Sequence, residues 1–123
     1  MSFIFVALGG AVGACGRHAI SLIPLKTSFP FLTLFTNIGG ALLIGFIVGI
    51  AEQHEDTPKN LVTFLKTGVC GGFTTFSTFS LETYNLFTEK MYGLAILYMI
   101  LSIVSCIFGV WIGKKLSLLC KGV

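Results

Sequence analysis

The stretch Gly68–Glu82 reads GVCGGFTTFSTFSLE, and the rest of the chain is best understood from it. It lies inside a hydrophobic segment, yet it holds adjacent glycines and hydroxyl residues where a continuous apolar helix would hold leucine and valine. Phe73, Phe76 and Phe79 recur at every third position, which predicts that Phe76 and Phe79 lie on nearly one helix face. Non-helical backbone is tolerated at membrane depth only where it is buried in protein or lines a polar cavity. The stretch therefore predicts a helix that breaks inside a membrane and forms a site.

The composition of the whole chain predicts an integral membrane protein. Of the 123 residues, 54% are hydrophobic and 11% are charged. Soluble domains carry charge on about a quarter of their residues, so this chain has too few charges to cover a surface that faces water. The net charge of +3 fits lysines that flank membrane spans and does not indicate nucleic-acid binding. Four cysteines without CxxC spacing predict small apolar side chains rather than a zinc site or disulfides: Cys15, Cys70, Cys106 and Cys120.

Hydrophobic segments long enough to cross a bilayer divide the chain into spans within a single transmembrane domain, residues 1–123. We expect four spans of about 20 residues, at about 3–23, 31–51, 61–87 and 93–113, with the third broken near 71–75. Small residues four positions apart, such as Gly9 and Gly13, predict that helix backbones approach closely. The predicted fold class is an all-α membrane protein.

Polar side chains inside these spans have roles that the residues alone leave open. Arg17 either extends to the membrane interface, or supplies positive potential at a pore mouth or in a buried ion pair. Asn37 shares a helix face with Thr33 and either bonds a neighbouring helix or lines a polar path. Glu82 follows the aromatic run and is the only acid within an otherwise apolar span, and we expect it at an aqueous vestibule. In the fourth span a common face holds Tyr98, Ser102 and Cys106.

Four helices packed together are too small to enclose a path, so a pore requires a second copy of the chain. The basic residues bias the orientation only weakly, with five on the side of the termini and three on the other. Insertion in both orientations, and with it an antiparallel dimer, therefore stays open. A broken helix on the two-fold axis would bring two sets of freed carbonyls together as a seat for one cation. The spans offer donors and aromatic edges, which suit a small anion, although packing alone also explains the phenylalanines.

Three motifs resemble the fluoride channel (Fluc) family of small four-span, dual-topology membrane proteins. They are GGAVGACGR, which ends at Arg17, the TxxTN pattern of Thr33–Asn37, and GVCGGFTTFSTFSLE itself. The likeness extends over essentially the whole chain in length and number of spans. It implies a passive, fluoride-selective channel that exports cytoplasmic fluoride across the inner (plasma) membrane. It also implies an antiparallel homodimer with two pores and a structural sodium ion at its centre.

The resemblance also assigns roles to individual residues. Those implied for the fluoride path are Phe76, Phe79, Asn37, Thr75, Ser77, Tyr98 and Ser102. Arg17 and Glu82 would act electrostatically at the vestibule, and the backbone carbonyls of Gly71 and Thr74 would coordinate the sodium ion. The family pattern favours a third hydroxyl on the fourth span, where this chain has Cys106, with Ser105 as the alternative.

Three other interpretations compete with a homodimeric channel. The chain is alternatively one subunit of a heterodimeric fluoride channel, paired with a paralogous subunit. A small multidrug-type, proton-coupled exporter would need a carboxylate in the first span, where this chain has only Arg17. A non-conducting scaffold would use the phenylalanines for packing. We do not expect an enzyme, because neither His18 nor His54 lies near a nucleophile or metal partner in sequence.

Overall fold

The computed structural model describes residues 1–121, and within that range the chain is helical and has no strands. Its long helices are α1 (Ser2–Ser21), α2 (Phe31–Gln53) and α6 (Tyr92–Leu118). Between α2 and α6 lie α3 (Lys59–Val62), η1 (Thr63–Cys70), α4 (Gly71–Phe73) and α5 (Phe76–Thr88). We refer to Lys59–Thr88 as the broken segment. The predicted all-α fold class is confirmed.

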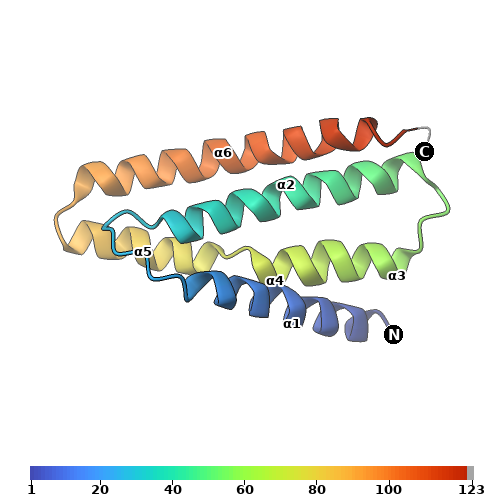
Figure 1. The fold of residues 1–123 in the computed structure, drawn as a ribbon, viewed down its shortest axis with the longest axis horizontal. Coiled ribbons are helices and arrows are strands. Elements are labelled where there is room, and N and C mark those ends of the chain that lie inside the picture. The colour runs from blue at the N-terminus through green and yellow to red at the C-terminus, as the bar shows by residue number, and fades with distance from the viewer. Residues whose placement is uncertain (122–123) are drawn as a thin grey trace.

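Helices α1, α2 and α6 are each long and apolar enough to cross a membrane. The broken segment runs alongside them, and the chain starts and ends at the same end of the bundle (Figure 1). Most of the large hydrophobic side chains on α1 and α6 are exposed, among them Phe3, Leu8, Ile103, Ile107 and Phe108. Such an apolar outer surface is what a bilayer solvates, so the chain is a multi-pass membrane protein.

The helices pack in two pairs, α2 against α6 and α1 against η1 and α4. Glycines permit both contacts. A methyl group on Gly9 would meet the carbonyl oxygen of Phe64 in η1, and one on Gly45 would meet that of Val110 in α6. In lipid, where burial of apolar surface gives little driving force between helices, close backbone packing is a main source of attraction. The small-residue spacing in the sequence thus has a direct structural role.

The broken segment is interrupted at Thr74 and Thr75, whose backbones are extended. Helix α5 then begins at Phe76, and the Thr75 side chain caps it by accepting a hydrogen bond from the amide of Thr78 at 3.1 Å. Such a cap satisfies one of the amides that a helix N-terminus leaves unpaired. The sequence did not indicate that the stretch before the break, η1, would be a π-helix. Short π-helical turns occur within helices most often at functional sites.

Candidate functional site

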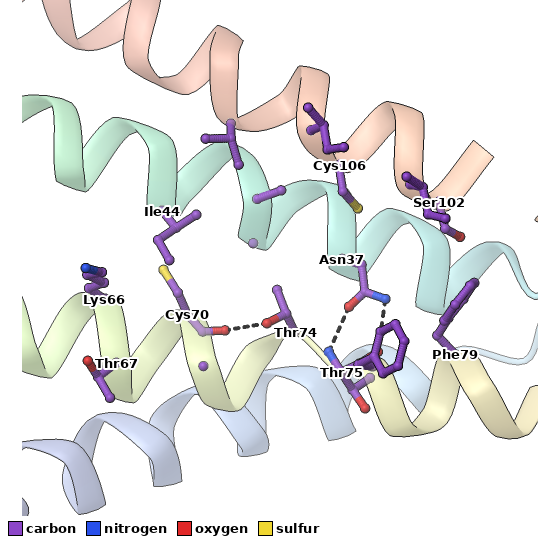
Figure 2. A pocket seen from close by; sticks show the side chains of 17 residues that line it. Asn37, Ile44, Lys66, Thr67, Cys70, Thr74, Thr75, Phe79, Ser102 and Cys106 are labelled. Carbon is purple, nitrogen blue, oxygen red and sulfur yellow. Dashed lines mark hydrogen bonds between the residues drawn. The ribbon is translucent and has the colours of Figure 1, made fainter. Parts of the chain in front are cut away.

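An open groove runs along the break and is lined by α2, the broken segment and α6. Its volume is about 680 Å³. Of the residues that the sequence singled out for a site, those lining it are Asn37, Gly71, Thr74, Thr75, Phe76, Phe79, Ser102 and Cys106. Ser77, Tyr98, Arg17 and Glu82 are not part of its lining. Figure 2 shows side chains from α2, the broken segment and α6 around the break.

Asn37 pairs with the backbone of the residue at the break. Its Nδ2 donates to the carbonyl oxygen of Thr75 at 3.1 Å, and its Oδ1 accepts from the Thr75 amide at 2.8 Å (Figure 2). One carboxamide thus satisfies both backbone groups of Thr75, and leaving such groups unpaired away from water is costly. Of the two roles considered for Asn37, bonding to a neighbouring segment is the one the structure contains. Asn37 is also among the residues that line the groove, and one of its two amide N–H groups is not used in the bond to Thr75.

Hydroxyl groups cluster on the α5 side of the break. The Thr75 hydroxyl lies 3.2 Å from that of Ser77 and 3.1 Å from that of Thr78. Thr74 instead donates back to the carbonyl of Cys70 at 2.8 Å, which closes the last turn before the break. Thr75 is therefore occupied mainly in capping α5, and Ser77, which is exposed, lies beside the groove rather than in it.

Phe76 and Phe79 differ sharply in their surroundings. Phe79 is buried and its ring packs edge-on against Tyr98, with centroids 5.0 Å apart. Phe76 lies 5.6 Å from Phe79 between centroids, yet 79% of it is exposed. The two rings share a face, as predicted, with Phe79 fixed in the protomer and Phe76 projecting from it. In a membrane, a ring this exposed is covered either by lipid or by another protein surface.

Glu82 is held by two hydroxyl groups from neighbouring helices. Thr33 donates to its Oε1 at 2.6 Å, and Tyr98 donates to its Oε2 at 2.8 Å. The carboxylate is partly buried, so the structure places it in a network across α2, α5 and α6 and not in open water. Sequence reasoning missed this role of Thr33. The only signal was its position four residues before Asn37 on the same helix face.

Ser102 presents a free hydroxyl group in the groove wall. Its Oγ is buried and has no hydrogen-bond partner within residues 1–121. One turn further along α6, Cys106 also lines the groove, whereas the Ser105 hydroxyl bonds to the carbonyl of Leu101 in its own helix. The face of α6 that carries Ser102 and Cys106 therefore contributes one hydroxyl group and one thiol group to the groove wall. Ser105 is not part of the lining of the groove.

Arg17 reaches the break from α1. Its Nε donates to the carbonyl oxygen of Gly72 at 3.2 Å. Within residues 1–121 the one salt bridge joins Lys114 to Glu52, so Arg17 is not in an ion pair there. Its contact stabilises the C-terminal turn of α4, where carbonyl groups are freed and a positive charge is favourable.

The carbonyl groups of Gly71 and Thr74 are available at the break. The hydrogen bonds made there engage the carbonyls of Cys70, Gly72 and Thr75, and none within residues 1–121 engages those of Gly71 or Thr74. Gly71 is also exposed and lines the groove. Carbonyl oxygens are suitable ligands for a hard cation, so the donor set fits a sodium ion in its chemistry.

Of residues 1–121, Lys66 is the one charged residue that lines the groove, and the sequence did not assign it there. It lies on η1 and is exposed (Figure 2). The position of Lys66 along the helix gives its depth in the bundle but not the direction in which its side chain points. Among the residues that the structure describes, no carboxylate lines the groove.

A helical membrane protein with donor groups and aromatic edges at a broken helix has the features of an ion-conducting protein rather than of an enzyme. The sequence profile of one family, described as CrcB-like protein, Camphor Resistance (CrcB), matches residues 4–114. The chain belongs to this family.

Its relatives include a "Fluoride-specific ion channel FluC" of Ruminiclostridium cellulolyticum, 44% identical over 95% of this chain and 92% of the relative. A protein of the same name from Rhodopseudomonas palustris is 39% identical over 94% of this chain and 96% of the relative. One from Clostridium perfringens is 43% identical over 93% and 91%. The relatives are named as ion channels, in agreement with the expectation that the chain is not an enzyme.

Proposed function

We propose that the chain forms a passive, fluoride-selective channel that exports fluoride from the cytoplasm across the inner (plasma) membrane. The observation that carries this proposal is the unpaired Ser102 hydroxyl in a groove that holds donors but no carboxylate. A hydroxyl without a partner donates readily to an anion, and the edge of the Phe79 ring carries positive character toward the same ion. The names of the relatives point to fluoride as that anion.

The driving force in this mechanism is the membrane potential. Fluoride inside the cell is an anion, and moving one charge down the potential is worth about 2.3 kcal/mol per 100 mV. No proton coupling or hydrolysis is required. Selectivity over chloride would come from a narrow path whose donors replace the hydration shell of the smaller ion.

The path requires a second copy, in this proposal an antiparallel partner related by a two-fold axis. Phe76 is 79% exposed on a groove that is open along one side. A second copy would cover this ring and close the groove. Because the contact is symmetric, what one protomer contributes its partner also contributes, and two equivalent pores result.

The same axis gives a place for the structural sodium ion. The free carbonyls of Gly71 and Thr74 would supply two oxygen ligands from each protomer, so a symmetric pair would supply four. The ion would hold the two breaks together. Its role would be structural, and the conducted anion would not pass through it.

The alternatives make different demands on the same groove. A proton-coupled exporter needs a titrating acid on α1, and α1 carries none. A subunit of a heterodimeric fluoride channel would carry the same groove but conduct only with a paralogous partner. No feature of this protomer favours the heterodimeric channel, and fluoride efflux from liposomes that contain this chain alone distinguishes it from the homodimeric channel.

The test is fluoride efflux from liposomes that contain the purified protein, started with a potassium ionophore and followed with a fluoride electrode. Chloride-loaded liposomes give the selectivity. We expect fast fluoride release without chloride release, and strong suppression in Phe76→Ile and Ser102→Ala. Phe3→Ile is the matched control, because Phe3 is an exposed ring far along α1 from the break. Silence of the unmodified protein would overturn the homodimeric channel. Equal loss in the control would overturn the assigned path.

A further inference from the structure

A second cavity lies at the C-terminal ends of α2 and α6, the end of the bundle where the chain also starts and finishes. Its volume is about 330 Å³, and its walls include Glu52 and Gln53 of α2 and Trp111, Lys114 and Lys115 of α6. None of its lining residues also lines the groove at the break. The cavity and the groove are therefore lined by different sets of residues.

The charged groups of the cavity leave an excess of one positive charge. Lys114 pairs with Glu52, with its Nζ 2.9 and 3.0 Å from the two carboxylate oxygens. Lys115 has no such partner within residues 1–121, and its Nζ lies 5.7 Å from the centre of the Trp111 ring. One carboxylate against two ammonium groups favours an anionic ligand. A ligand ammonium would find the one carboxylate already engaged.

A second polar group of the cavity lacks a partner and specifies the ligand further. The Nε2 of Gln53 donates to the carbonyl of Gly49 at 2.7 Å and to the hydroxyl of Ser117 at 3.1 Å. These contacts fix the orientation of the carboxamide. Its Oε1 is buried and accepts no hydrogen bond within residues 1–121. A buried acceptor left unpaired is unfavourable, so a ligand that brings a neutral donor such as a hydroxyl gains by entering.

The location indicates where such a ligand comes from. Trp side chains concentrate at the boundary between lipid and water, and both lysines of the cavity lie near the C-terminal end of the membrane helix α6. Basic pockets between membrane helices bind the headgroups of anionic lipids. We propose that this cavity binds the headgroup of an anionic glycerophospholipid. The lipid phosphate lies against Lys115, and a headgroup hydroxyl donates to Oε1 of Gln53.

Trp111 is the only tryptophan of the chain and therefore reports directly on the cavity. The protein is reconstituted in phosphatidylcholine vesicles with increasing fractions of brominated phosphatidylglycerol or brominated phosphatidylcholine, whose bromines quench nearby tryptophan. We expect stronger quenching by phosphatidylglycerol at equal fraction. Lys115→Gln should weaken that preference about fivefold, as expected for one lysine at an anionic surface. Lys115→Arg should retain it, and Lys26→Gln, which alters a lysine in the loop at the other end, should leave it unchanged.

Four outcomes decide the proposal. Equal quenching by the two lipids in the unmodified protein overturns it, as does a preference that Lys115→Gln does not reduce. Brominated phosphatidylmethanol, which has the same charge but no headgroup hydroxyl, tests the Gln53 contact and should bind more weakly than phosphatidylglycerol. Binding of equal strength overturns that part. Soluble glycerol 3-phosphate should not relieve the quenching, and relief would assign the site to a free phosphate ester instead of a lipid.

Discussion

Replacing Asn37 with alanine removes the side chain that pairs with both backbone groups of Thr75 at the break. The two hydrogen bonds measure 3.1 and 2.8 Å, and both are partly buried. An unsatisfied buried backbone group costs about 1–3 kcal/mol, whereas an interhelical hydrogen bond in a membrane averages about 0.6 kcal/mol. Because the site borders an open groove, water offsets part of the larger figure. We therefore expect Asn37→Ala to lower the free energy of unfolding by about 2–4 kcal/mol.

The assay is equilibrium unfolding of the purified protein in mixed micelles, followed by circular dichroism. Asn85→Ala is the matched control, since Asn85 is exposed on α5 and its side chain makes no hydrogen bond within residues 1–121. A surface change of this kind alters stability by about 0.5 kcal/mol or less. Asn37→Asp keeps the acceptor for the Thr75 amide but loses the donor, so it should fall between the two. If Asn37→Ala and Asn85→Ala unfold alike, Asn37 does not hold the break.

Three further changes test other parts of the structure. Gly45→Ala places a methyl group against a backbone carbonyl of α6 and should lower the stability by about 1–3 kcal/mol, whereas Gly93→Ala, where the space is open, should not; thermal unfolding that ranks them in the other order would contradict the packing. Tyr98→Phe removes a donor to Glu82 from a fully buried ring and should lower stability by about 1–2 kcal/mol and slow fluoride efflux; an unchanged rate would show that the network does not support the path. Thr75→Val removes the cap of α5 and should cost about 1 kcal/mol in chemical unfolding, and no loss of stability would contradict its capping role.

The sequence was sufficient for the fold class and for the position of the interruption, because both depend on local composition. Adjacent glycines followed by threonines weaken a helix, and the structure is extended at Thr74 and Thr75. Long apolar segments likewise predicted the helices α1, α2 and α6 that are able to span a bilayer. The π-helical form of η1 was not predictable, since its hydrogen-bond register depends on packing against α1.

The sequence predicted several of the residues that line the site, but not the hydrogen bonds that they make. Asn37, Thr75 and Phe79 do meet at one groove. That Asn37 would bind the backbone of Thr75 depends on how α2 is rotated against the broken segment, which no periodicity specifies. The partner of Glu82 was missed for the same reason, because Thr33 lies on another helix, 49 positions away in sequence. Arg17 had several roles open to it, and only the packing of α1 on α4 directs it to Gly72.

The pairing of the helices determines when each contact between helices is able to form during synthesis. Helix α1 packs chiefly on the broken segment, and α2 packs chiefly on α6, so each pair is separated by an intervening helix. A nascent chain that has released only α1 and α2 into the bilayer has neither of its main contacts, because α1 and α2 touch each other little. The first pair closes once the third segment leaves the ribosome, and the second waits for the last helix. If synthesis stalls before residue 92, α2 lacks its main partner α6. Quality-control proteases would then recognise the unpaired helix.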